Sequence, residues 1–440
     1  MNNLQHKINK YLQKHTVKIG KFYSHENRAF ENVVVIPAIG ELENVKKLAA
    51  SLDGSNEPES KRKTLVLFVV NNLKSTPDEI KENNFRTIDF LKNQISSNSV
   101  NAQTGTKLNI AVMDCSTEGN ELPEKEGGVG LARKIGMDKA LSFFDYDRDQ
   151  KRIITALDAD CLVDKGYFSA IINSFNNHKL SAAYVKFAHR FPDEEENLKA
   201  IINYEIFLRY YLLGLKFAQS PYAIHTIGST MICDAESYVK IGGMNKRKAA
   251  EDFYFMEKLS KIVDIKEISE TTIYPSPRGS WRVPFGTGQR VNRFLSHTTD
   301  EYLLYNPKSF LVLKKWLRVF NEADFSSSSG LLLKASQDIS PALEEFLKIN
   351  NFAQSWESIK TNSKQIEQLN KQKKFWFDGF KTLKLIHYLR DNGFPPAFTF
   401  KALNEMFDFT ELSFAPKYEG TEIPPADIQK KYLRFLREVA

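Results

Sequence analysis

Residues 153–160 have the sequence IITALDAD, in which an uninterrupted apolar run ends in two aspartates separated by one alanine. Such a run, rich in β-branched residues, is typical of a strand that is buried on both faces. Three similar runs precede it, at residues 33–36, 65–70 and 107–113. Helical patterns lie between them, so the order is strand, helix, strand. The sequence therefore predicts an α/β fold with a mostly parallel sheet flanked by helices.

The pattern changes beyond about residue 300, where the apolar spacing becomes helical. We expect a flexible joint at residues 326–329, which are four serines, and a helix over residues 375–392 that stops before Gly393 and Pro395. The expected organisation is an N-terminal helix at residues 1–24, an α/β domain at 25–300 and a mainly helical region at 301–440.

The N-terminal segment predicts a basic amphipathic helix, with Leu4, Ile8, Tyr11 and Leu12 on one face and several lysines around it. Two interpretations are open: the helix contacts a membrane surface as a peripheral element, or it docks on its own domain with the lysines in solvent.

The composition is that of a globular protein, with 440 residues, 42% hydrophobic residues and a formal net charge of +7. The mild positive charge suits an anionic ligand such as a nucleotide and is too weak to indicate nucleic acid. Three widely spaced cysteines, no apolar run long enough to cross a bilayer and no secretory signal predict a cytoplasmic protein.

Asp158 and Asp160 carry the strongest chemical signal. Carboxylates two residues apart share one side of an extended chain, and here they follow a strand end, where open α/β sheets bind ligands. Such oxygen donors suit Mg²⁺ or Mn²⁺ bound to phosphate. The plain alternative is a polar turn.

Glu251 and Asp252 form a second acidic pair, after the glycine turn of Gly242 and Gly243. One of them can act as a general base, or both can simply favour a helix start.

Two further segments carry cations. The Pro- and Gly-rich segment 274–288 holds Arg278, Trp281 and Arg282, and guanidinium groups suit phosphate. The segment 127–134 is a glycine turn that leads to Arg133 and Lys134, and it matches neither a dinucleotide-binding fingerprint nor a phosphate-binding loop.

Taken in order, these segments resemble the family-2 glycosyltransferases of the GT-A fold, which is Rossmann-like. The resemblance covers residues 33–290 and rests on five motifs. They are the strand and turn from Val34 to Glu41, the Gly130–Gly136 segment with Lys134 where the family has Asn, the D-x-D motif at Asp158–Asp160, the glycine turns at 228–229 and 242–243, and the acidic pair at 251–252.

The resemblance implies inverting, non-processive transfer of a sugar from a nucleotide-diphosphate sugar to an acceptor hydroxyl, as in polysaccharide biosynthesis. Asp252, next to Glu251, would be the base, and Asp158 and Asp160 would hold Mn²⁺ or Mg²⁺. The implied donor-binding residues are Pro37, Glu41, Asn71, Arg133, Asp158, Arg278, Trp281 and Arg282. The implied acceptor-binding residues are Gly228 and Ser229, and the acceptor would be a glycan or a lipid-linked molecule.

Three departures from the family pattern bear on this prediction. Ile39-Gly40 replaces an aromatic-Asn pair, Asn71-Asn72 stands where Asp-Asp-Ser commonly reads the nucleotide base, and Arg278-x-x-Trp281-Arg282 reverses the final Arg-Trp order of the motif that processive members carry. A sugar nucleotidyltransferase and a non-catalytic binding or assembly subunit with a degenerate transferase domain remain alternatives.

Overall fold

The computed structural model describes residues 3–25, 29–104, 107–279, 286–298 and 300–440. The chain forms two compact units, each built from two separate stretches of sequence. Unit 1 consists of residues 1–190 and 226–286, and unit 2 of residues 191–225 and 287–440. Trp281 and Arg282, which we expected at the donor, lie outside the described residues.

Unit 1 is built around one sheet with the strand order β1-β4-β3-β2-β5-β8-β7-β9-β6. Most of its paired residues belong to parallel pairs, including the central run β4-β3-β2-β5. The predicted α/β class is thus confirmed. The strands are β1 (Lys21–Tyr23), β2 (Asn32–Ala38), β3 (Thr64–Asn71), β4 (Asn109–Cys115), β5 (Ile153–Ala156), β6 (Leu162–Val163), β7 (Ala182–Phe187), β8 (Met231–Asp234) and β9 (Ile265–Tyr274).

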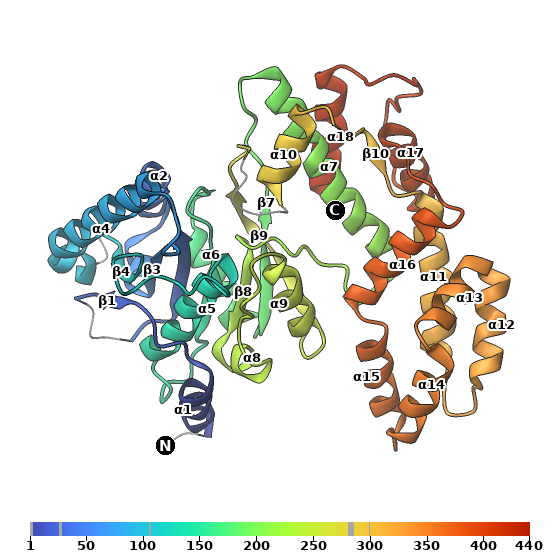
Figure 1. The fold of residues 1–440 in the computed structure, drawn as a ribbon, viewed down its shortest axis with the longest axis horizontal. Helices are drawn as coiled ribbons and strands as arrows, with labels where there is room; N and C mark the ends of the chain where they lie inside the picture. Colours follow the sequence, from blue (N-terminus) through green and yellow to red (C-terminus); the bar gives the residue numbers. More distant parts are fainter. Residues whose placement is uncertain (1–2, 26–28, 105–106, 280–285, 299) are drawn as a thin grey trace. The chain divides into compact units, whose positions relative to one another are not determined.

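Helices cover both faces of the central strands, and this explains the uninterrupted apolar runs (Figure 1). Val34 and Ile36 of β2 point into a core shared with α2, α4 and α6. The neighbouring Val35 points the other way, towards Gly136 of α5. The helices of unit 1 are α1 (Asn3–His15), α2 (Leu42–Ser55), α3 (Pro58–Arg62), α4 (Asp78–Thr104), α5 (Val129–Ala140), α6 (Tyr167–Asn177), α8 (Ala235–Lys240) and α9 (Glu251–Ser260).

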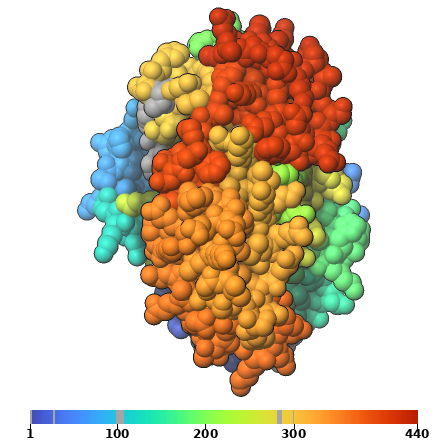
Figure 2. All heavy atoms as spheres, turned by 90° about the vertical axis from the view of Figure 1, so that its right-hand side faces the viewer, coloured from blue at the N-terminus to red at the C-terminus, as the bar shows by residue number. Residues whose placement is uncertain are grey.

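Unit 2 is mainly helical, as the apolar spacing predicted, and its helices from residue 307 onward are yellow-orange to red in Figure 2. Its core contains Trp316, Trp356 and many phenylalanines. The elements are α7 (Glu195–Phe217), α10 (Thr287–Leu295), β10 (Leu303–Leu304), α11 (Pro307–Glu322), α12 (Ser329–Ile339), α13 (Pro341–Ile349), α14 (Phe352–Thr361), α15 (Ile366–Trp376), α16 (Gly379–Asp391), β11 (Ala397–Phe398), α17 (Thr399–Phe409) and α18 (Ala426–Val439).

Two local predictions in unit 2 are wrong. The helix expected over residues 375–392 is interrupted at Asp378, whose side chain accepts a hydrogen bond from the Lys381 N–H and so begins α16 anew. The serine run is an ordered helix start and no flexible joint, because Ser328 caps α12 and Ser326 donates to Asp324.

None of the helices in the described part of the chain combines the length and the apolar character that crossing a bilayer requires.

Candidate functional site

Asp158 and Asp160 lie just beyond the carboxyl end of β5, which pairs in parallel with β2. Their side chains keep 36% and 26% of their surface exposed. The loop therefore presents two accessible carboxylates at the edge of the sheet where open α/β sheets bind ligands.

Arg133 of α5 links this loop to the second acidic pair. Its Nη2 donates to Asp158 Oδ1 at 2.5 Å, and its Nη1 donates to Glu251 Oε1. Arg133 is only 3% exposed. Burial alone would lower the pKa of Arg133, but the charges of Asp158 and Glu251 outweigh it and raise the pKa. The site thus contains a permanent buried cation that holds together both predicted acidic motifs.

Gly228 leaves the space that Arg133 occupies. A Cβ on Gly228 would lie 2.3 Å from Arg133 Nη2, which is too close for two non-bonded atoms. Ser229, the next residue, is 1% exposed. The structure thus brings Gly228 to the predicted site, but as a neighbour of the arginine, and acceptor binding by these two residues stays a prediction.

Arg278 forms a second bridge, between Glu41 and the D-x-D loop. Its Nη2 donates to Glu41 Oε1 and, at 3.2 Å, to Asp160 Oδ2. Its side chain is 38% exposed, whereas that of Glu41 is 5% exposed. Burial would lower the pKa of Arg278, but Glu41 and Asp160 raise it. Arg278 is therefore a charged, partly accessible group that can also reach an anion from solvent.

Asp252 is a carboxylate of this region with a raised pKa. Burial, joined by the negative charge of Glu251, raises the pKa of Asp252 to about 7, although Arg133 and the Phe253 N–H oppose this rise. A carboxylate with a pKa near neutrality suits a general base, because it can both take up and release a proton at physiological pH.

Asn71 and Pro37 lie at the same edge of the sheet, near the ends of β3 and β2. The Asn71 side chain is 5% exposed and donates to the carbonyls of Ala38 and Val69, both at 3.1 Å. Its amide group thus links the ends of β2 and β3, and its contact with a nucleotide base stays a prediction.

The carboxylate oxygens of Asp158 and Asp160 are suitable ligands for a divalent cation of the Mg²⁺ or Mn²⁺ type. Two carboxylates are what such cations commonly take from the protein when substrate phosphates supply further oxygens. Among the described residues no group of three His, Cys, Asp or Glu could hold a metal ion by itself. A cation at Asp158 and Asp160 would therefore depend on a phosphate-bearing ligand.

Solved structures similar to this chain include residues 1–349 of S. aureus TarS in complex with UDP-GlcNAc, at 13% identity and a TM-score of 0.37, covering 93% of this chain and 90% of that one. The mannosyltransferase PcManGT from Pyrobaculum calidifontis, in complex with GDP-Man and Mn²⁺, is 12% identical with a TM-score of 0.35, covering 99% and 93%. GalNAc-T7 with UDP, GalNAc and Mn²⁺ is 10% identical with a TM-score of 0.35, covering 77% and 63%.

No family model matches the sequence, and no curated protein matches it. These structural similarities are too low to transfer a function or a residue role to this chain.

Asn84 lies near the predicted site, although the sequence analysis gave no indication of a role for it. It is 1% exposed within α4, its Oδ1 accepts from the Gly40 N–H at 2.8 Å, and its Nδ2 donates to the Asn71 carbonyl at 3.1 Å. It thereby joins the turns that follow β2 and β3. A lone asparagine inside a helical pattern carries no signal for such a role.

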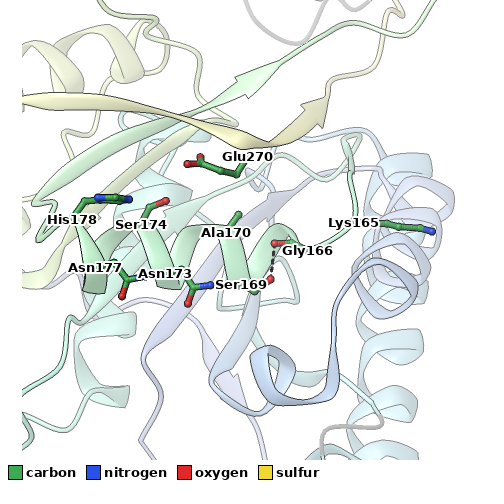
Figure 3. Close-up of a pocket in the computed structure, with 9 residues that line it drawn as sticks. All are labelled: Lys165, Gly166, Ser169, Ala170, Asn173, Ser174, Asn177, His178 and Glu270. Atoms are coloured by element: carbon green, nitrogen blue, oxygen red, sulfur yellow. Dashed lines mark hydrogen bonds between the residues drawn. The ribbon is translucent and has the colours of Figure 1, made fainter.

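A cavity of about 300 Å³ lies elsewhere in unit 1, along α6 and next to β9 (Figure 3). Its lining includes Asn173, Asn177, His178 and Glu270. None of the predicted site residues lines it.

Proposed function

We propose that unit 1 is the catalytic domain of a glycosyltransferase that moves a sugar from a nucleotide-diphosphate sugar to an acceptor hydroxyl. The observation that carries this proposal is the bridge formed by Arg133 between Asp158 and Glu251. It places the two acidic motifs at one edge of the sheet. One motif can hold a phosphate-bound cation, and the other contains a carboxylate poised to accept a proton.

The donor diphosphate would bind next to Asp158, Asp160 and Arg278. A divalent cation bound there would neutralise the charge that develops on the leaving nucleoside diphosphate. Arg278 is ion-paired with Glu41 and Asp160 and partly exposed, so its fork of donors can also bind phosphate oxygens. We keep Pro37, Glu41, Asn71, Trp281 and Arg282 as predicted donor contacts on the sequence resemblance alone.

Asp252 would accept the proton of the acceptor hydroxyl while that oxygen attacks the anomeric carbon. A single displacement of this kind inverts the configuration at that carbon. Arg133 would hold Glu251 and Asp158 in place during the reaction, so its role is to orient the groups on both sides of the reacting bond. Gly228 and Ser229 remain proposed on the acceptor side.

A glycan or lipid-linked acceptor, non-processive transfer and a role in polysaccharide biosynthesis are part of the same proposal. The apolar residues Ile8 and Tyr11 of helix α1 are buried in the protein, so they do not face a membrane. The lysines of α1 are exposed. A peripheral contact would therefore be electrostatic, with no insertion of the apolar face.

The substitution Asp160→Asn tests the proposal. It removes one carboxylate at nearly constant size, and we expect it to abolish sugar transfer while the circular dichroism spectrum and the melting temperature stay close to those of the unaltered protein. The matched control is Asp164→Asn, which makes the same chemical change at an exposed residue four positions further on. Full transfer activity in the Asp160 variant would contradict the assignment.

Thermal unfolding with UDP, GDP, CDP and ADP, each with Mn²⁺, Mg²⁺ or chelator, identifies the nucleotide of the donor. A ligand at about 100 times its dissociation constant adds roughly 2.7 kcal/mol. This corresponds to a shift of several degrees at about 2–4 °C per kcal/mol. A metal-dependent shift names the base, whereas no shift with any nucleotide favours a binding or assembly subunit. Release of pyrophosphate from a nucleoside triphosphate and a sugar phosphate would indicate a nucleotidyltransferase.

A further inference from the structure

A second buried group of polar side chains lies in unit 1, where α1 contacts the rest of the unit. We call Tyr11, Lys134, Asp138 and Tyr238 the latch. Asp138 Oδ1 accepts from Tyr11 Oη at 2.8 Å and from Tyr238 Oη at 2.7 Å. Lys134 Nζ donates to Asp138 Oδ2 at 2.9 Å and to Tyr11 Oη at 3.1 Å. All four residues are at most 5% exposed.

Each polar side-chain atom of the latch has a hydrogen-bond partner, and the charges of the latch balance. The Tyr11 oxygen donates one hydrogen bond and accepts another, while Lys134 and Asp138 form an ion pair. Burial and the neighbouring Asp138 raise the pKa of Tyr11, so its hydroxyl stays protonated and able to donate. Buried polar networks of this kind are often no more stabilising than apolar packing, and their best-supported contribution is to fix one arrangement of the surrounding elements.

The latch touches helix α5 and the turn at Gly243 that leads to Glu251. Lys134 follows Arg133 directly on α5. On the other side, a Cβ on Gly243 would lie 1.8 Å from Tyr11 Oη, so the tyrosine fills the space that this glycine leaves. Gly243 has a φ of 73°, which favours glycine in any case.

The segment after Gly243 runs directly to Glu251. Within it Asn245 Nδ2 donates to the Glu251 carbonyl at 2.8 Å. The segment also packs on the start of α5, because a Cβ on Gly130 would lie 2.2 Å from the Arg247 carbonyl oxygen. Tyr11 therefore contacts both α5 and the segment from Gly243 to Glu251, which are the two segments that Arg133 joins at the site.

We propose that Tyr11 is a positioning residue, by which the N-terminal helix fixes the spacing between Arg133 on α5 and Glu251 on α9. This gives Lys134 a function where the resembled motif has asparagine. The consequence for catalysis rests on the proposed glycosyltransferase function, whereas the consequence for local order does not.

The test compares Tyr11→Phe and Asp138→Asn with Tyr146→Phe in the chain of residues 1–440. The first two change the latch at nearly constant side-chain size. Tyr146→Phe is the matched control, because its hydroxyl donates to the Leu141 carbonyl at 2.7 Å in a buried part of unit 1 beyond the other end of α5. Hydrogen exchange is measured for residues 129–136 and 243–252, and kcat and KM are measured in parallel below the melting temperature.

We expect exchange in both segments to rise about tenfold or more in the latch variants and to stay unchanged in the control. We expect kcat to fall about tenfold with a smaller change in the donor KM, because misplaced groups lose transition-state stabilisation first.

Unchanged exchange in the latch variants, or an equal rise in the control, would overturn the proposal. A rise in exchange with unaltered kcat would overturn it as well. If the unaltered protein transfers no sugar, the proposed function fails, and the exchange data alone decide whether Tyr11 orders these segments.

Discussion

Arg133 reaches carboxylates that lie 25 and 118 residues away in the sequence. One of them, Glu251, is 3% exposed. A buried carboxylate left without its partner costs about 3–5 kcal/mol, so the arginine is needed for the fold as well as for the chemistry that we propose. A glycine is needed at position 228 for the same reason, since a side chain there would displace Arg133.

The pH dependence of transfer depends on Asp252, whose pKa is raised to about 7. A general base acts when deprotonated, so kcat/KM should fall as the pH drops below about 7. Glu251→Gln removes a negative charge that favours the protonated form of Asp252. The pKa should therefore fall, and the acid limb of the profile should move to lower pH by about one unit or more.

The control for this profile is Glu236→Gln, which removes the same charge from an exposed position on α8. Its acid limb should coincide with that of the unaltered protein. If the limb stays in place in the Glu251 variant too, the group that titrates is not Asp252.

Helix α5 is the element on which the site is built, because it carries Arg133 and lies against β2 and β3. Gly136 permits this close approach. A Cβ there would lie 2.3 Å from Val35 Cγ1 and 2.8 Å from Val69 Cγ2, on the sheet face that α5 covers. A helix bearing any larger residue at this position would have to move away from the sheet, and Arg133 would move with it.

Gly136→Ala should therefore destabilise the protein by about 1–3 kcal/mol through overpacking, even though alanine favours helices. The matched control is Gly54→Ala in α2, where an added Cβ meets nothing within 4 Å. That change should stabilise by about 0.4–1 kcal/mol. Denaturant unfolding of both variants measures the difference, and equal effects of the two would refute the packing argument.

At the level of elements, the sequence predicted the buried parallel strands because apolar runs report burial directly, and it placed Asp158 and Asp160 correctly at the end of β5. It did not predict that Arg133 joins Asp158 to Glu251, because pairing across 118 residues leaves no local pattern. The interruption at Asp378 was missed for a different reason, since apolar periodicity continues across a residue that caps a new helix.

At the level of the whole molecule, the boundary expected near residue 300 differs from the compact units. Helix α7 lies inside the stretch that resembles a transferase domain, yet it belongs to unit 2. Its Tyr210 and Leu213 share a core with Phe310 and Trp316. The sequence shows α7 only as an apolar helix, and its partners follow about a hundred residues later, so no local pattern could assign it.

The two units predict how shortened chains behave. A chain that ends at residue 300 keeps α7 but loses α11 and α18. Gly214 would lose its contact with Phe310, and the fully buried Glu205 would lose Arg437, which donates to it at 2.7 Å. The apolar face of α7 would be exposed, and exposed apolar surface favours association between chains. We therefore expect this chain to aggregate, which sedimentation and dye binding measure.

A chain that contains only residues 1–190 and 226–286, joined by a flexible Gly-Ser linker, should behave differently. It keeps the whole sheet, the latch and every described residue of the candidate site. We expect it to remain monomeric in sedimentation, to unfold cooperatively and to give the same nucleotide-dependent thermal shift as the full chain. If instead the chain that ends at residue 300 were monomeric and the linked chain aggregated, α7 would belong with the sheet. The discontinuous division of the molecule would then be wrong.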